Sequence, residues 1–192
     1  MPQTLTDTAS PKQVVDEIFR LLRERGDMMY GEDVTERMHG LQCGVLAEQA
    51  GCEPELVAAS LLHDLGHLIH DLGEDVAERG IDAAHEEVGD RWLRRWFPES
   101  VTEPARLHVD AKRYLCTIDA EYRAALSDAS ARSLELQGGQ MSDEEVRNFE
   151  SSPYFKDAVT LRRFDDLGKD PDLAEVELER FRPVLESLIT RV

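Results

Sequence analysis

The chain has 192 residues, and its hydrophobic content of 41% is sufficient for one globular domain with a core of its own. Forty acidic and 22 basic side chains give a formal net charge of −18, which argues against nucleic acid or an anionic membrane surface as a partner. We therefore predict a single domain over residues 1–192 that binds neither.

Helical periodicity dominates the first half of the sequence. Apolar residues recur on one face in each segment, and proline, glycine or a short polar residue stands near several of the expected ends. The expected helices are 11–25, ended by Gly26; 34–50; 53–71, opened by Pro54; a fourth capped by Asp82; and a fifth capped by Thr102 that runs to Leu115.

The second half is less regular. Residues 127–141, SDASARSLELQGGQM, show the weakest periodicity and are predicted to be a loop around Gly138 and Gly139. Ser142 with Glu145 forms a capping-box pattern for a short helix. Two further helices are expected, one from Pro153 and one within 170–189. Because strand patterns are essentially absent, the fold class is predicted to be all-α.

Six side chains of metal-ligand type stand at widely separated points of the chain. Only two are neighbours, and the others fall on different predicted helices, as expected for a site inside a helical bundle. Taken singly, each is more often a packed core residue, and an aspartate near an arginine can be a simple ion pair. The candidates are His39, His63, Asp64, His85, His108 and Asp165.

The order of these residues, His39, then His63-Asp64, then Asp165, resembles the H…HD…D motif of the HD-domain superfamily. His85 and His108 resemble the additional histidines of members that bind two metals. The segments LLHDLGHL, LELQGGQMSDEEV and AVTLRRFDDLGK further resemble the small bacterial HD-domain oxygenases of phosphonate catabolism, over about residues 20 to 170.

This resemblance implies an HD-domain helical bundle with an internal dinuclear site that holds a mixed-valent Fe(II)/Fe(III) pair, a cofactor shared with myo-inositol oxygenase. It implies O2-dependent cleavage of the C–P bond in a 1-hydroxyphosphonate. Asp64 would bridge the two irons, and the other five ligands would divide between them. His39, His63 and Asp165 would nearly close one iron, whereas His85 and His108 would leave the other open to substrate.

A second set of residues is expected to bind the substrate. His67, Lys112 and Arg162 each lie about one helical turn from a predicted ligand. With the hydroxyl of Ser130 they would form a clamp for the phosphonate through charge-assisted hydrogen bonds. Without the resemblance, Lys112 and Arg162 would be interpreted as solvated surface cations. His70, at the expected exposed end of its helix, is assigned no role.

The segment DMMYGED concerns the other end of the substrate. Relatives that act on 2-aminoethyl substrates are expected to use a glutamate at the position of Glu32 and a tyrosine where this chain has Met29. A thioether suits methyl groups better than a phenol, and Tyr30 could offer its ring to a quaternary cation. We therefore favour (1-hydroxy-2-(trimethylammonio)ethyl)phosphonate, giving glycine betaine and phosphate. The primary-amine analogue, giving glycine, is the alternative, and plain core packing of Met29 is equally compatible with the sequence.

Two other classes of protein remain open: a metal-dependent HD phosphohydrolase, and a non-catalytic HD-fold binding module. As an enzyme of phosphonate catabolism, the protein would act on a small molecule made by a preceding hydroxylase. The first residues, MPQTLTDTASPKQ, lack the features of a secretory signal, and no apolar run could span a bilayer. The three cysteines are scattered, as expected for reduced thiols in a cytoplasmic protein.

Overall fold

The computed structural model describes residues 5–29, 33–70, 83–173 and 176–190, and within these ranges the regular elements are all helices. An isolated bridge between Met29 and Thr35 is the single β-type pairing there. The predicted all-α fold is confirmed. The elements are α1 Pro11–Arg25, α2 Glu36–Gln49, α3 Pro54–Leu62, α4 Leu65–Ile69, α5 His85–Leu93, α6 Glu99–Arg106, α7 His108–Ile118, α8 Ala120–Ala124, α9 Asp128–Leu136, α10 Asp143–Glu150, α11 Phe155–Leu167, the 3₁₀ helix η1 Leu178–Phe181 and α12 Arg182–Leu188.

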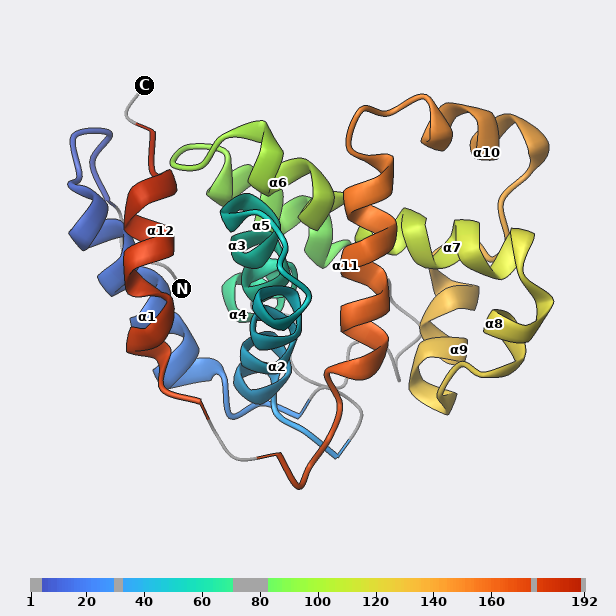
Figure 1. Ribbon diagram of the computed structural model, residues 1–192, viewed down its shortest axis with the longest axis horizontal. Coiled ribbons are helices and arrows are strands. Elements are labelled where there is room, and N and C mark those ends of the chain that lie inside the picture. Colours follow the sequence, from blue (N-terminus) through green and yellow to red (C-terminus); the bar gives the residue numbers. More distant parts are fainter. Residues whose placement is uncertain (1–4, 30–32, 71–82, 174–175, 191–192) are drawn as a thin grey trace.

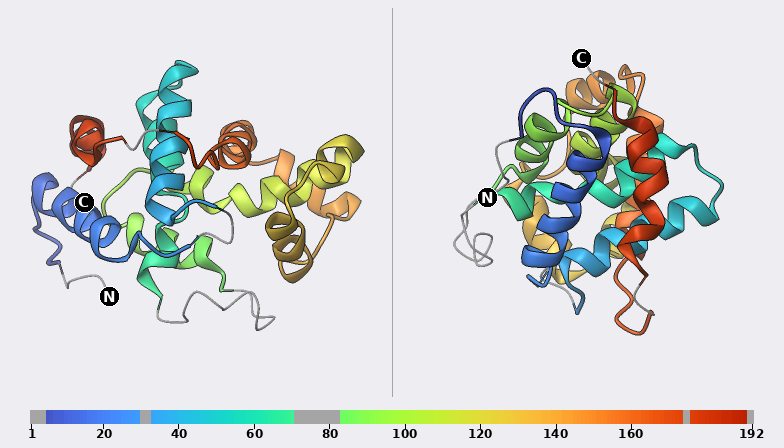
Figure 2. Two further views of the ribbon diagram at one scale, coloured as in Figure 1. Left: turned by 90° about the horizontal axis from the view of Figure 1, so that it is seen from below. Right: turned by 90° about the vertical axis from the view of Figure 1, so that its left-hand side faces the viewer.

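The helices are arranged along the longest axis of the molecule. Figure 1 shows α1 and α12 side by side at one end, α2 to α6 in the middle, and α7 to α10 at the other end, with α11 between the last two groups. The same order is visible in the left view of Figure 2, and the right view looks along this axis with α1 and α12 in front. No described helix is both long and apolar enough to cross a membrane.

Two hydrophobic clusters hold the helices together. The larger one joins α1 to α6 with α12 and one part of α11, and the smaller one joins α7, α10 and another part of α11. Leu161 belongs to the larger cluster and Ala158 to the smaller, and both are fully buried. Burying a residue the size of leucine contributes about 1.5–3 kcal/mol, so these contacts fix α11 firmly between the two clusters.

The first correction to the predicted helices concerns residues 53–71, which form two helices instead of one. Helix α3 ends at Leu62 and α4 begins at Leu65, with the His63-Asp64 pair between them. The break arises because Asp64 has φ −97° and ψ 9°, which is outside the α-helical region. Two polar side chains therefore stand at a bend in the backbone, not on a continuous apolar helix.

The predicted fifth helix also differs. Thr102 does not cap it: α6 already begins at Glu99, after Pro98, and Thr102 is buried within the helix. The helical region is then divided at Leu107 into α6 and α7. For the fourth helix, α5 begins directly after Ala84, and the predicted cap Asp82 lies outside the described residues.

The predicted loop over 127–141 contains helix α9. Ser127 caps this helix by accepting a hydrogen bond from the backbone N–H of Ser130. Its apolar periodicity is weak because Ser130 and Leu134 are its only buried residues among those described. Two other predictions in this part are confirmed: Gly138 and Gly139 have φ values of +97° and +70° in a turn, and Ser142 forms the capping box of α10.

Candidate metal centre

Four helices and one interhelical bend bring the six predicted ligands together. His39 lies on α2, and the His63-Asp64 pair forms the bend between α3 and α4. The first residues of α5 and α7 supply His85 and His108, and α11 supplies the last member, Asp165. All six side chains are buried, with at most 6% of any residue exposed. We refer to these six residues as the histidine–aspartate cluster.

A close helix crossing places His85 in the cluster. A Cβ atom on Gly66 of α4 would lie 1.9 Å from the carbonyl oxygen of His85, a distance that no side chain tolerates. Glycine at this position therefore allows α4 and α5 to approach more closely than any other residue would. The approach brings the imidazole of His85 against the carboxylate of Asp64, with Nε2 3.1 Å from Oδ1.

The carboxylate of Asp64 lies at the centre of the cluster, and each of its oxygens faces a different pair of histidines. Oδ2 is 3.5 Å from Nε2 of His39 and 3.3 Å from Nε2 of His63. Oδ1 faces His85 and lies 3.5 Å from Nε2 of His108. Within the described part of the chain, neither oxygen accepts a hydrogen bond although both are buried. A buried carboxylate of this kind needs a cationic partner, which a metal ion at each oxygen would supply.

Asp165 is associated with one of the two pairs. Its Oδ1 is 3.5 Å from Nε2 of His39, and its Oδ2 is 3.9 Å from Nε2 of His63. The cluster therefore divides into a three-residue group of His39, His63 and Asp165, and a two-residue group of His85 and His108, with Asp64 shared. This arrangement is consistent with a dinuclear metal site.

Three histidines of the cluster are oriented by backbone carbonyl groups. The Nδ1 atoms of His39, His63 and His108 lie 2.8, 2.9 and 2.6 Å from the carbonyl oxygens of Gly168, Ser60 and Ala105. A carbonyl oxygen only accepts, so Nδ1 carries the proton and Nε2 of a neutral ring presents its lone pair to the cluster.

The paired Nε2 atoms lie close to each other. The distance is 3.2 Å between His39 and His63 and 3.1 Å between His85 and His108. Two lone pairs at this distance repel unless a proton or a metal ion lies between them. His85 differs from the other histidines because the group near its Nδ1 is the carboxylate of Glu86, at 3.5 Å.

The protonation states of His39, His108 and the two aspartates suit metal binding, and His63 is the exception. Burial lowers the pKa of His39 and lowers that of His108 to about 3, against the attraction of nearby carboxylates. Burial also opposes the charge on His63, but Asp64 and Asp165 outweigh it and raise its pKa to about 9. Burial likewise opposes ionisation of the two aspartates, yet His63 holds the pKa of Asp64 well below its usual range, and Arg162 does the same for Asp165. Ionised carboxylates and neutral imidazoles are the ligand forms that a divalent metal requires, so His63 would release a proton when a metal binds.

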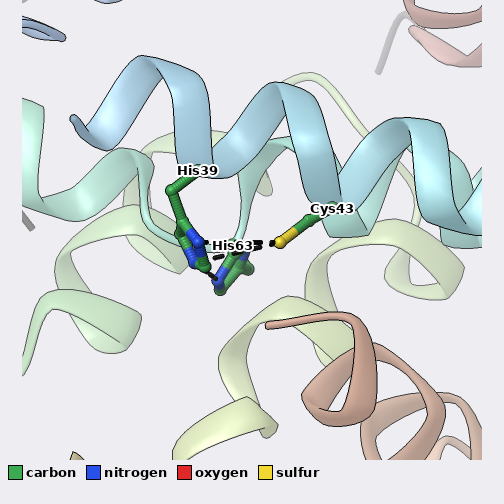
Figure 3. A group of neighbouring side chains, drawn as sticks. All are labelled: His39, Cys43 and His63. Carbon is green, nitrogen blue, oxygen red and sulfur yellow. Dashed lines mark hydrogen bonds between the residues drawn. The ribbon is translucent and has the colours of Figure 1, made fainter. Parts of the chain in front are cut away.

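Cys43 approaches the cluster, although the sequence analysis gave it no role there. Figure 3 shows His39 and Cys43, one turn apart on α2, both directed toward His63. The Cys43 sulfur lies 3.8 Å from Nε2 of His39. Its thiol donates a hydrogen bond to the carbonyl oxygen of Phe164 at 3.5 Å, and burial raises its pKa well above the usual value. Burial therefore favours the protonated thiol, and Cys43 is a further side chain of metal-ligand type beside His39 and His63. Its i,i+4 spacing from His39 was the signal in the sequence.

His67 lies beside the two-residue group. Its ring stacks on His85, with centroids 3.9 Å apart and an interplanar angle of 17°. Burial and the proximity of His85 lower the pKa of His67 well below its usual value, so the ring is neutral. His70, expected to be exposed, is only partly so, and its ring lies 5.6 Å from that of His67.

Lys112 and Arg162 are buried, which excludes the surface interpretation. Nζ of Lys112 donates to Oγ of Ser133 at 2.7 Å, and burial together with Arg162 lowers the lysine pKa to about 8. Arg162 donates from Nη1 to Asp165 at 2.6 Å, from Nη2 to Asp166, and from Nε to the hydroxyl of Tyr122 at 3.0 Å. Both cations therefore lie near the cluster, but Arg162 is held mainly by carboxylates.

Ser130 is buried on α9, and its hydroxyl accepts a hydrogen bond from Nζ of Lys169 at 3.1 Å. Sequence reasoning did not identify Lys169, Ser133 or Tyr122. For the first two, the only signal in the sequence was their spacing: Lys169 lies four residues after Asp165, and Ser133 lies three residues after Ser130. Tyr122 carried no signal because its contact with Arg162 joins distant parts of the chain.

The residues proposed for the far end of the substrate have a different environment. Met29 precedes α2, pairs with Thr35 through an isolated bridge and has 51% of its surface exposed. It is not part of the described cluster. Glu32 and Tyr30 lie outside the described residues, so their predicted contacts with the substrate stay predictions.

A helical bundle with a buried histidine–aspartate cluster in the order H…HD…D defines a metal-binding HD-domain protein. No family model matches the chain. A hydroxymethylphosphonate dioxygenase of Gimesia maris is 41% identical over 186 residues, which cover 96% of this chain and 92% of that protein. The [1-hydroxy-2-(trimethylamino)ethyl]phosphonate dioxygenase (glycine-betaine-forming) of Leisingera caerulea is 39% identical over 179 residues, 93% of this chain and 91% of that protein.

An uncharacterized protein of Acanthamoeba polyphaga mimivirus is 36% identical over 160 residues, 82% of this chain and 73% of that protein. Identity at this level over nearly the whole length shows the family. The chain belongs to the HD-domain phosphonate dioxygenases, and the prediction of a dioxygenase is confirmed.

Proposed function

We propose that this protein cleaves the C–P bond of a 1-hydroxyphosphonate with dioxygen, releasing phosphate, and that the histidine–aspartate cluster is its catalytic site. The observation that carries the proposal is the position of Asp64, whose two buried oxygens each face a separate pair of histidines. A carboxylate shared in this way supports a dinuclear site, which dinuclear HD phosphohydrolases would also use, and the dioxygenase family supports the oxidative reaction.

We assign His39, His63 and Asp165 to one metal, His85 and His108 to the other, and Asp64 to both. Nitrogen and oxygen donors of this kind accept iron, manganese, zinc or nickel, and the resemblance to mixed-valent oxygenases favours an Fe(II)/Fe(III) pair. When bound, such a pair would supply the activation of dioxygen and the one-electron chemistry that side chains lack. The group with two histidines has fewer protein ligands and is therefore the proposed position for substrate.

The chain's own contribution is to bind and orient the phosphonate. Lys112 and Ser130 would hold phosphonate oxygens, and His67, neutral and stacked on His85, would accept or donate a hydrogen bond at the substrate. Arg162 would act partly through Asp165, because the hydrogen bond between them fixes the carboxylate. Fixed placement of C1 beside the metal is what such a site adds to the reaction rate.

The favoured substrate is (1-hydroxy-2-(trimethylammonio)ethyl)phosphonate, which with one O2 gives glycine betaine and phosphate. Glu32 would face the ammonium group and Met29 its methyl groups. Hydroxymethylphosphonate, which with one O2 would give formate and phosphate, is a second candidate because the relative named for it is 41% identical to this chain. Both substrates share the C1 hydroxyl and the phosphonate, so the same clamp serves either. Each would be made by a preceding reaction that installs the C1 hydroxyl.

The test is an oxygen-electrode assay of the iron-loaded protein with the trimethylated, primary-amine and hydroxymethyl substrates, with phosphate measured in parallel. We expect one phosphate released per O2 consumed and the highest kcat/KM for the trimethylated compound. Preference for hydroxymethylphosphonate would support the second candidate, and preference for the primary amine would support the glycine-forming reaction. Release of phosphate under argon would overturn the oxidative mechanism in favour of a phosphohydrolase.

A further inference from the structure

The proposed phosphonate clamp has less positive charge available than its residue types suggest. Arg162 was expected to supply a guanidinium to the substrate, yet two of its nitrogens donate to Asp165 and Asp166. These carboxylates neutralise most of its charge locally. Lys112 alone would then face a phosphonate that carries up to two negative charges, within a protein of net charge −18. A second cation is needed to balance the ligand.

Lys169 is placed to be that cation. It follows Gly168 directly, and the carbonyl oxygen of Gly168 holds His39 in the histidine–aspartate cluster. Its backbone is therefore fixed at the edge of the cluster, and its half-buried side chain reaches Ser130. The charge of Lys169 also acts on Lys112, whose pKa it lowers together with burial and Arg162, and on Cys43, where it opposes the larger effect of burial, which raises the pKa.

Two serines of α9 lie one turn apart, and each accepts a hydrogen bond from a different lysine. Lys112 of α7 donates to Ser133 at 2.7 Å, and Lys169, after α11, donates to Ser130 at 3.1 Å. The neighbouring positions of α7 and α9 can be followed in Figure 1. Two ammonium groups from different elements therefore converge on one short helix.

The hydroxyl groups of the two serines are used differently. Ser133 donates its proton to the carbonyl oxygen of Ser130 at 3.1 Å. Ser130 accepts from Lys169, and among the described residues its own hydroxyl donates to no protein acceptor. A hydroxyl that accepts from an ammonium group is polarised to donate more strongly. Ser130 with Lys169 is thus a donor unit suited to an anionic oxygen.

We propose that Lys169 is a second cation of the phosphonate subsite, acting with Ser130, and that the same unit binds inorganic phosphate as product. This inference rests on the proposed function and adds a specificity-determining residue to it. The ligand class is a tetrahedral oxyanion with two charges. Lys112 and Lys169 repel each other in the free protein, and binding of the anion relieves this repulsion.

The experiment is a calorimetric titration of the iron-loaded protein with inorganic phosphate, which needs no turnover. Lys169→Met is compared with Lys156→Met, which removes an exposed lysine of α11 and makes the same change in net charge. We expect Lys169→Met to raise the Kd of phosphate about 10- to 100-fold, as for loss of a charge-assisted hydrogen bond, and to raise KM for the hydroxyphosphonate similarly. The metal content and kcat should change little, and Lys156→Met should match the wild type.

Two further variants keep the test decisive. Lys169→Gln serves if the methionine variant does not fold, and Lys169→Arg should recover most of the phosphate affinity because it restores the charge. An unchanged phosphate Kd in Lys169→Met, with or without a lower Tm, would overturn the inference and leave Lys169 a structural role. Absence of oxygen consumption by the wild type with every hydroxyphosphonate would contradict the proposed function instead, while the phosphate titration would still decide the role of Lys169.

Discussion

The two halves of the histidine–aspartate cluster share the carboxylate of Asp64 but differ in their surroundings. The group of His39, His63 and Asp165 has three side chains besides Asp64, and two of these residues are fully buried. The group of His85 and His108 has two, and the half-buried ring of His67 stacks on one of them. The first half therefore offers three side chains of its own to a metal and the second offers two, and in the proposed function the second half is the position for substrate.

The partners of the Nδ1 atoms set one histidine apart from the other three, since His108 is also oriented by a backbone carbonyl group. Backbone carbonyl groups orient His39 and His63, whereas His85 lies beside the carboxylate of Glu86. A carbonyl only fixes a ring, but a carboxylate also increases the electron-donating strength of the imidazole. If Asp64 bridges two metals as proposed, its two oxygens would face metals with unequal surroundings, because the side chains behind each half differ.

The largest effect is expected from Asp64→Asn, which breaks the feature common to both halves. An amide retains the shape but cannot supply an anionic oxygen to two metals, so we expect loss of most bound iron and a fall in kcat of about 1,000-fold or more. Metal analysis and the oxygen-electrode assay measure both effects. Asp157→Asn, at an exposed position of α11, is the matched control. Full iron content in Asp64→Asn would contradict the bridging role.

The next-largest effect is expected from Arg162→Met, which should lower the free energy of unfolding and disturb only the half that contains Asp165. In Arg162→Met, the buried carboxylate of Asp165 loses its cation, and leaving such a charge unpaired typically costs about 3–5 kcal/mol. We expect a clear fall in the free energy of unfolding together with weaker binding of one metal, that of the three-residue group. Denaturant unfolding and metal analysis provide the measurement.

Arg163→Met is the control for this substitution, since it removes an exposed arginine from the adjacent position of the same helix. The Arg162 variant could instead keep wild-type stability and both metals and lose only substrate affinity. That result would show that Arg162 binds the substrate and does not act by holding Asp165.

Much of this fold could be predicted from the sequence, because an apolar stripe and a capping box specify α1 and a capping box specifies the start of α10. The ligand-type residues of the cluster were also recognisable as a set, since histidines on otherwise apolar helices are unusual. The interhelical bend at His63-Asp64 was not predictable, because the leucines around it fit a continuous helix equally well. Its conformation is decided by packing against α2 and α5.

Helix α9 and the partners of the two lysines were missed for a related reason. With Ser130 and Leu134 as its buried residues, α9 has almost no apolar pattern. The hydrogen bonds of Lys112 and Lys169 to its serines join positions 21 and 39 residues apart. Such contacts depend on tertiary structure, so residue spacing alone does not reveal them.

A third prediction concerns pH and the open half. The pKa of Lys112 is lowered to about 8, chiefly by burial and by Arg162. An anion binds best while this lysine is protonated, so affinity should fall as the pH rises through this value and stay nearly constant well below it. The charged groups that act on Lys112 are Arg162, Lys169, Asp64 and Asp165.

Sulfate is the suitable probe because its own charge does not change in this range. We expect the Kd of sulfate to rise about 10-fold across the transition, and Lys112→Met to bind weakly at every pH with the transition removed. A transition that persists in Lys112→Met would assign the titration to another group.

The smallest effect is expected from Glu86→Gln, which tests whether the carboxylate beside His85 tunes the open half. Glutamine keeps the size of the side chain but removes the negative charge near Nδ1, which lies 3.5 Å from Oε2 of Glu86. Loss of such a second partner typically weakens metal binding about 10-fold, and we expect one of the two metals to become easier to remove with a chelator. Glu87→Gln, a more exposed neighbour whose carboxylate pairs with Arg106, is the control. If both metals are removed at the wild-type concentration of chelator, the halves differ only in ligand number, and the carboxylate of Glu86 contributes nothing to their inequality.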